Sequence, residues 1–184
     1  MLSEDLWLPF VLTLPAYVAN PLAVLWGGGA PMDGGKLWRD GRRALGDGKT
    51  WRGFYGGALS GLALGVVLVA VLGTKLAAPT LEPIRYVIAF AAMSFGALAG
   101  DILGAFVKRR RGLERGAKAP GLDQYDFLIG AFLFLAVVDP GFLAATYVAG
   151  DRVWGLLLVI LITPALHRAV NLIGYRMGKK KEPW

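Results

Sequence analysis

Five stretches of this 184-residue chain are long and apolar enough to cross a lipid bilayer as α-helices. They cover approximately residues 6–27, 54–74, 84–107, 126–149 and 153–176, and a bilayer core requires about 20 apolar residues per helix. Asp139, Pro140 and Gly141 interrupt the fourth stretch and predict a kink there. We therefore expect an all-α integral membrane protein with about five transmembrane helices, in which residues 1–184 form a single membrane-embedded domain.

The uneven distribution of basic residues predicts the orientation of these helices. The connectors at 28–53 and 108–125 each hold six lysines and arginines, and five more follow His167. The opposite side carries only Lys75, Arg85 and Arg152. Since basic residues concentrate on the cytoplasmic side of membrane proteins, we expect two basic cytoplasmic loops, an outside N-terminus and a cytoplasmic C-terminus. The chain would then be a multi-pass protein of the cell membrane.

Scarce residue types limit the chemistry. The sequence has no cysteine and a single histidine, which excludes disulfide frameworks, thiol catalysis and multi-histidine metal sites. A bound metal would take oxygen ligands, and such ligands favour Mg²⁺ or a similar hard cation.

Two of the predicted helices carry glycine at every fourth position. Glycines at this spacing share one helix face and let two helix backbones approach closely. We expect this packing within the bundle, although a homodimer would use the same kind of surface. The glycines are Gly57, Gly61 and Gly65 in the second stretch, and Gly96, Gly100 and Gly104 in the third.

Polar residues occur at a similar depth in three predicted helices, below the basic face. Asn20 lies in the first stretch, and Asp101 lies about 10 Å from the cytoplasmic end of the third. His167 and Asn171 lie near the end of the fifth. Because ionisable groups in a membrane are costly and mark functional sites, we expect a water-filled cavity that opens to the cytoplasm.

Two more aspartates, Asp123 and Asp126, share one helix face where the fourth stretch begins. Acidic residues suit a helix N-terminus, so helix capping alone would explain them. Together with Asp101, they would also place three carboxylates at one rim among many cations. That combination is typical of a site for a divalent metal and a polyphosphate.

The first basic connector mixes acids, bases and glycines, whereas a surface that only attracts anionic lipids does not require the acids. Its segment 46–50, Gly-Asp-Gly-Lys-Thr, is not a P-loop, because Arg43 stands where that motif needs glycine. Glycines do let backbone N–H groups approach phosphate closely. The candidate substrate-binding residues of this connector are Asp33, Lys36, Arg43, Asp47, Gly48, Thr50 and Arg52, beside a candidate catalytic Lys49.

Residues 14–57 and 100–131 resemble two blocks of the archaeal CDP-archaeol synthases, which are related to bacterial phosphatidate cytidylyltransferases. The pattern of the wider superfamily is Gly-Asp, then Lys-Arg, then Pro-Gly and two aspartates three positions apart. The bacterial Lys-Asp and His-Gly-Gly elements are absent here. The matching residues are Gly100-Asp101, Lys108-Arg109, Pro120-Gly121, Asp123 and Asp126.

The resemblance implies a catalytic domain whose active site faces the cytoplasm. Its reaction would be Mg²⁺-dependent transfer of CMP from CTP to the geranylgeranylated glycerol phosphate lipid 2,3-bis-(O-geranylgeranyl)-sn-glycerol 1-phosphate, with release of pyrophosphate. Asp101, Asp123 and Asp126 would bind the metal. Asn20 would place the lipid phosphate. The cations that would neutralise the triphosphate are Lys49, Arg43, Arg52, Lys108 and Arg109.

Other functions fit parts of the sequence. A CDP-alcohol phosphotransferase motif begins as residues 40–44 do, but Leu45, Phe54 and Ala58 replace residues that it needs. A small transporter or channel for an anionic solute would suit Asp101 and the basic loops, yet the outer halves of the helices offer few polar groups. Topology already explains the basic residues and no recognition module is present, so no nucleic-acid partner is expected.

Overall fold

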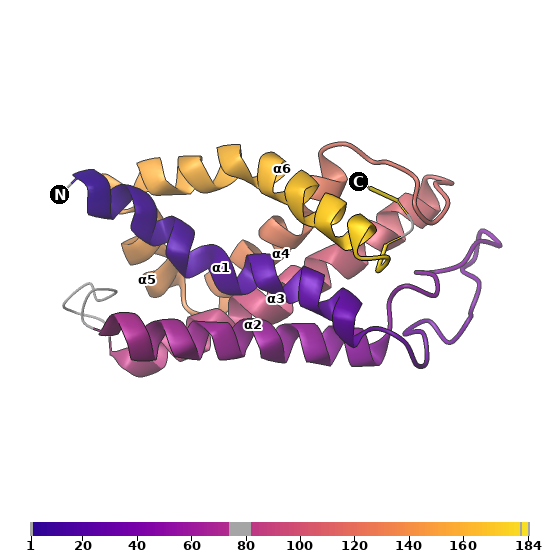
Figure 1. Ribbon diagram of the computed structural model, residues 1–184, viewed down its shortest axis with the longest axis horizontal. Coiled ribbons are helices and arrows are strands. Elements are labelled where there is room, and N and C mark those ends of the chain that lie inside the picture. The colour runs from indigo at the N-terminus through magenta and orange to yellow at the C-terminus, as the bar shows by residue number, and fades with distance from the viewer. Residues whose placement is uncertain (1, 74–81, 181, 184) are drawn as a thin grey trace.

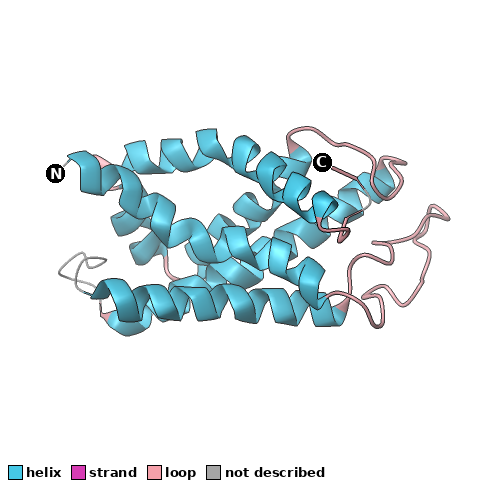
Figure 2. Ribbon diagram, in the orientation of Figure 1, coloured by secondary structure: helices cyan, strands magenta, loops and turns pink. Residues whose placement is uncertain are grey.

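The computed structural model describes residues 2–73, 82–180 and 182–183, and these residues contain helices and loops but no β-strand. Figures 1 and 2 show the long helices side by side in one elongated bundle. The predicted all-α class is therefore confirmed. Residue 74, Lys75 and Lys181, which entered the predictions above, lie outside the described residues. The elements are α1 (Leu2–Trp26), α2 (Trp51–Leu72), α3 (Pro83–Arg110), α4 (Leu122–Val138), α5 (Pro140–Leu143), the π-helical turn η2 (Ala144–Val148) and α6 (Arg152–Arg176).

Four helices in the described part of the chain, α1, α2, α3 and α6, are long and apolar enough to cross a membrane. They correspond to the first, second, third and fifth apolar stretches. Only 17% of the most apolar window of α6 and 22% of that of α2 is buried by protein, so the outward faces of these helices are available to lipid. In α3 the share is 56%, and α3 accordingly lies at the centre of the packing.

The fourth predicted stretch, 126–149, is broken at Asp139. Helix α4 ends at Val138, and Pro140 begins the short α5, which continues into η2. The Asp139 carboxylate accepts a hydrogen bond from Phe142 N at 2.8 Å and pairs with Arg85 at 2.5 Å. The predicted kink is confirmed. Because none of these three elements reaches the length of a full span, the fifth crossing stays a prediction.

The two basic loops lie at one end of the bundle. Figure 1 shows the loops at 27–50 and 111–121 at the same end as the C-terminus, while the N-terminus and α5 lie at the other end. This grouping agrees with the predicted arrangement of the loops. The side of the membrane that each end faces stays a prediction.

The glycine ladders lie in contacts between helices of the same chain. In α2, a Cβ added to Gly57 would lie 2.5 Å from the Ala19 carbonyl oxygen of α1, so the two backbones touch. In α3, Gly96 faces the Gly130 backbone of α4, and Gly100 faces the Asp126 backbone. The expected use of these glycines in packing the bundle agrees with these contacts.

We predict that Gly100→Ala destabilises the protein, because the new methyl group would overlap the Asp126 carbonyl and push α3 and α4 apart. Overpacking of this kind costs ~1–3 kcal/mol, which should lower the thermal unfolding midpoint in detergent by several degrees. Gly174→Ala in α6 is the matched control, since its methyl group would have no neighbour nearer than 3.5 Å. An unfolding midpoint equal to that of the control would contradict the proposed close approach of the two helices.

Candidate active site

The contact between α3 and α4 brings two aspartates together. Gly104 lies directly against the Asp126 side chain, and Asp101 lies one turn earlier on α3. The carboxylates of Asp101 and Asp126 are close enough to repel each other. Asp126 accepts one described hydrogen bond, from Phe127 N at 2.7 Å. Two carboxylates from different helices therefore share one partly buried position at the end of the bundle that carries the loops.

Two of the three predicted metal ligands, Asp101 and Asp123, are each paired with a lysine. Lys49 Nζ, from the end of the first loop, donates to Asp101 Oδ2. Lys108 Nζ, from the last turn of α3, donates to Asp123 Oδ1 at 2.5 Å. Asp123 Oδ2 also accepts from Ala119 N at 2.7 Å, which holds the residues before α4 in place. Asp123 thus orders the helix start, as the capping interpretation expected, and also faces a cation.

The site has the donor chemistry of a Mg²⁺ site without a preformed metal cage. Among the residues that the structure describes, no group of three His, Cys, Asp or Glu side chains is arranged to hold a metal ion. Mg²⁺ is, however, usually bound by one or two carboxylates together with water and substrate phosphates. Asp101 and Asp126 could supply those two carboxylates, so the residues present fit the ion. Their role as metal ligands stays a prediction.

The first loop is organised around one buried aspartate. Asp33 accepts hydrogen bonds from Gly35 N, Leu45 N and Gly46 N at 3.0–3.1 Å, and its carboxylate pairs with Arg43 at 2.9 Å. The Asp33 side chain is only 3% exposed. The Arg43 guanidinium and these N–H groups hold the pKa of the carboxyl well below its usual range. The stabilisation is therefore full above the unfolded-state pKa of about 3.9 and decreases as the pH falls below it.

Thr50 joins this loop to α2. Its Oγ1 accepts a hydrogen bond from Gly53 N at 3.1 Å, so Thr50 is the N-cap of α2. Gly48 lies against the guanidinium of Arg115 in the second loop, where a Cβ would be 3.4 Å away. Lys49 between them points to Asp101. The Gly-Lys-Thr sequence therefore starts a helix and directs one lysine into the bundle.

The first loop also docks on the end of α3. Arg110 contacts Asp40, and its Nη2 donates to the Arg43 carbonyl. The Trp38 ring packs edge-on against Phe106 with 5.0 Å between ring centroids. A loop of 24 residues between α1 and α2 is thereby fixed against a membrane-spanning helix.

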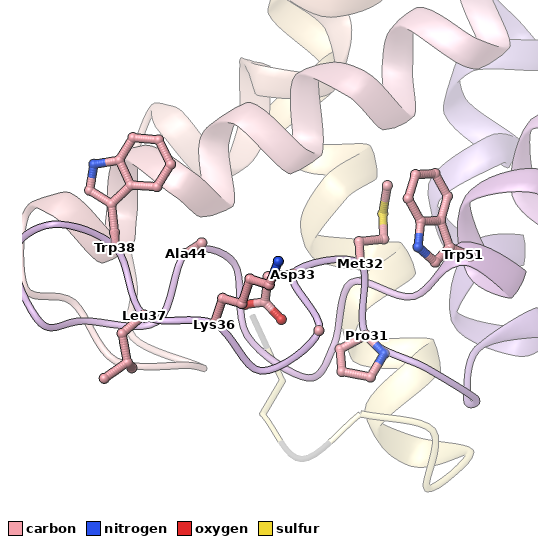
Figure 3. Close-up of a pocket in the computed structure, with 9 residues that line it drawn as sticks. Pro31, Met32, Asp33, Lys36, Leu37, Trp38, Ala44 and Trp51 are labelled. Carbon is pink, nitrogen blue, oxygen red and sulfur yellow. The ribbon is translucent and has the colours of Figure 1, made fainter.

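A cavity of about 490 Å³ lies within this docked loop. Figure 3 shows Asp33 and Lys36 in its middle, with Trp38 on one side and Met32 and Trp51 on the other. The two indole rings and the lysine could contact a base and an anion, respectively.

The remaining predicted residues differ in their surroundings. Asp47 pairs with Arg43 at 2.7 Å and is 68% exposed, so its described contact is within the loop. Arg52 is exposed, and its side chain passes Gly29. Arg109 donates to the Leu113 carbonyl, while its buried Nε has no hydrogen-bond partner among the described residues. The buried Oδ1 of Asn20 likewise has no partner in the part of the chain that the structure describes. The structure thus brings Lys49, Lys108 and the three aspartates together, and leaves Asp33, Arg43 and Asp47 engaged with one another.

Comparison with known proteins identifies the family. A family model described as CarS-like, CDP-archaeol synthase, matches residues 4–184. The CDP-archaeol synthase of Methanosphaerula palustris is 49% identical over 171 residues, which cover 93% of this chain and 99% of that protein. That of Thermococcus kodakarensis is 46% identical, covering 100% of this chain and 98% of that protein. The chain belongs to the CDP-archaeol synthase family.

A solved structure agrees with this assignment. A chain described as an intramembrane enzyme for archaeal membrane lipid biosynthesis is 38% identical and superposes with a TM-score of 0.65, covering 85% of this chain and 90% of that chain. The predicted family and the predicted enzyme class are confirmed, and the transporter alternative is not favoured. Membership of an enzyme family of lipid biosynthesis also agrees with a multi-pass membrane protein.

Lys180 lies near the site but was not among the site residues predicted from the sequence. Lys180, which follows α6, donates to Asn171 Oδ1, and Asn171 Nδ2 lies 3.2 Å from His167 Nε2. Burial lowers the pKa of Lys180, and the charges of Asp101, Lys49, Lys108 and Asp123 act on it as well. The sequence offered one usable signal, Gly178, whose φ of +68° lets the chain turn back after α6.

We predict that Asp33→Asn loosens the first loop, because an amide cannot pair with Arg43 and offers one acceptor oxygen where the carboxylate offers two. Trypsin should then cleave after Lys36, Arg39 or Arg42 at least ~10-fold faster than in the wild type, as expected when ~1.5–3 kcal/mol of charge-assisted hydrogen bonding is lost. Mass spectrometry of the fragments provides the measurement. Asp47→Asn is the control, because Asp47 is exposed and has one described partner. Equal cleavage rates in the two variants would show that Asp33 does not anchor the loop.

Proposed function

We propose that this protein transfers CMP from CTP to 2,3-bis-(O-geranylgeranyl)-sn-glycerol 1-phosphate and releases pyrophosphate. The observation that carries the proposal is the cluster of Asp101, Asp123 and Asp126 with Lys49 and Lys108 at one end of an apolar bundle. Such a cluster can bind a polyphosphate and a hard cation where the ends of the helices meet the membrane surface. The family name supplies the identity of the product.

The chemistry requires positioning and charge neutralisation. An oxygen of the lipid phosphate would attack the α-phosphorus of CTP, and the bond from that phosphorus to the bridging oxygen of the β-phosphate would break. The electron pair leaves with pyrophosphate. Because the lipid phosphate is already anionic, no strong general base is needed, and the single histidine is sufficient for such a site. Lys49 and Lys108 would stabilise the charge that builds up on the leaving group.

Asp101, Asp123 and Asp126 would hold Mg²⁺. When bound, the ion would offset the negative charge of the phosphate oxygens. Lys49 and Lys108 pair with two of these aspartates. Arrival of the triphosphate would give both lysines new anionic partners and leave the carboxylates free for the cation. Nucleotide and metal would therefore bind cooperatively.

The active site would face the cytoplasm, where CTP is made. The basic residues of both loops support this orientation, since they favour the cytoplasmic side. Helix α4, α5 and η2 together would form the fifth crossing, with Asp139 and Arg85 paired at the break. The N-terminus would then lie outside and the C-terminus inside.

The polar side chains in the rest of the bundle support an enzyme over a transporter. Tyr17 and Thr163 hydroxyls lie 2.5 Å apart, and those of Thr13 and Tyr147 lie 3.2 Å apart. Thr13, Tyr147 and Thr163 are fully buried. These pairs tie α1 to α6 and η2, so these polar groups of the bundle are engaged with one another.

The decisive experiment offers the purified protein CTP labelled at the α-phosphate, Mg²⁺ and the geranylgeranylated lipid phosphate in detergent. We expect the label to enter the organic phase and EDTA to prevent this. No labelled lipid from folded protein, with ether or ester lipid phosphates, would overturn the proposal. Movement of label into sealed vesicles without a lipid product would instead favour transport.

We predict that Asp126→Asn and Asp123→Asn each lower turnover by at least ~100-fold, because each removes a charge from the position that binds the metal and triphosphate. Asp151→Asn makes the same chemical change at the exposed start of α6, at the opposite end of the bundle, and should keep its activity. Thermal unfolding of the three variants checks that each is folded. Near-normal turnover in a folded Asp126→Asn protein would remove this residue from the metal site.

A further inference from the structure

The residues after α6 turn back and carry a lysine into the candidate active site. Gly178 adopts a φ of +68°, and the N–H groups of Lys179 and Lys180 both donate to the Gly174 carbonyl, at 2.9 and 3.2 Å. We call residues 177–180 the C-terminal hook. Its backbone hydrogen bonds fix the path of the chain, so the Lys180 side chain points along α6 toward Asn171.

Lys180 differs from the other two lysines of the site in its partners. Lys49 and Lys108 are each paired with an aspartate. Lys180 makes no ion pair among the described residues and contacts the neutral amide of Asn171, which is itself only 3% exposed. A partly buried ammonium group without a carboxylate is costly unless an anion completes its surroundings. The substrate phosphates provide such anions.

An apolar groove leads to this lysine from the side of the bundle. The groove has a volume of about 180 Å³ and lies between the ends of α1 and α6, with Val24 and Ile173 among its walls. Lys179 and Lys180 also line it, through the carbon chains of their side chains. Pro21 also lines it, and the adjacent Asn20 has a buried side-chain oxygen that finds no hydrogen-bond partner within the described residues. An apolar groove bordered by two lysines is complementary to a hydrocarbon chain that carries an anionic head.

We propose that Lys180 binds the phosphate of the lipid substrate at the inner end of this groove, and that Asn171 positions its ammonium group. This inference rests on the proposed function and assigns different lysines to the two substrates. Lys49 and Lys108 approach from the first loop and α3 and are held beside the aspartates, where the triphosphate would bind. Lys180 follows α6 and lines the groove, where a hydrocarbon chain would lie.

The test separates the two substrates kinetically. In Lys180→Ala we expect the KM for the lipid phosphate to rise ~10- to 100-fold, as for the loss of one charge-assisted hydrogen bond, and the KM for CTP to change less than ~2-fold. Arg176→Ala removes one exposed positive charge from the same end of α6 and should change neither value. Lys180→Arg should recover part of the lipid affinity, and Asn171→Ala should raise the same KM as Lys180→Ala.

A binding measurement distinguishes the possible failures. We would record the thermal stabilisation of each variant by CTP with Mg²⁺ and, separately, by the lipid phosphate in detergent. The wild type should respond to both and Lys180→Ala to CTP alone. A wild type that responds to neither would overturn the proposed function. A Lys180→Ala protein that loses its response to CTP, or keeps its full response to the lipid, would overturn the role of Lys180 while the proposed function stands.

Discussion

The rest of the site depends on the close approach of α3 and α4. Glycine at positions 96, 100 and 104 removes the side chains that would separate the two helices, so the backbone of α4 lies directly on α3. As a result, the Asp126 side chain lies against Gly104, one turn from Asp101 on α3. Two carboxylates at such a place repel each other unless cations are near. One of the lysines that meet this need, Lys108, comes from the last turn of α3, and the other, Lys49, comes from the first loop. The contact of Lys49 with Asp101 therefore binds that loop to the bundle.

This charge requirement explains the construction of the first loop. Lys49 can reach Asp101 because Thr50 begins α2 immediately after it and fixes the direction of the backbone. The preceding residues are held by Asp33, whose carboxylate accepts hydrogen bonds from the N–H groups of Leu45 and Gly46 across the loop. Arg110 then fastens the loop to α3. Lys49 is thus placed by a cap, a buried carboxylate and a docked arginine, without the strand that precedes a P-loop.

Much of the fold could be predicted because membrane-spanning helices are encoded locally. Twenty apolar residues in a row indicate a helix whatever surrounds them, and Asp139-Pro140 marks the break in the fourth stretch without knowledge of Arg85. The conformation of the first loop was harder to predict, because Asp33 is hydrogen-bonded to backbone N–H groups. Every residue type except proline has such a group, so no side-chain pattern points to Leu45 or Gly46. Lys180 was hidden for another reason. A C-terminal lysine is already explained by the rule for membrane topology, and only the turn at Gly178 separates it from its neighbours.

The charges gathered in the candidate site bear on how it would bind the proposed substrates and a metal. Lys49, Lys108 and Lys180 balance Asp101, Asp123 and Asp126, so these six side chains carry no net charge together when all are ionised. A nucleoside triphosphate and a lipid phosphate add several negative charges, which these six side chains do not offset. A divalent cation on the aspartates would restore the balance. The same side chains would then exchange partners as the substrates arrive, with the lysines moving to phosphate and the carboxylates to the metal. A site whose ionised side chains sum to zero charge can in this way hold them in a membrane and still bind a highly charged nucleotide.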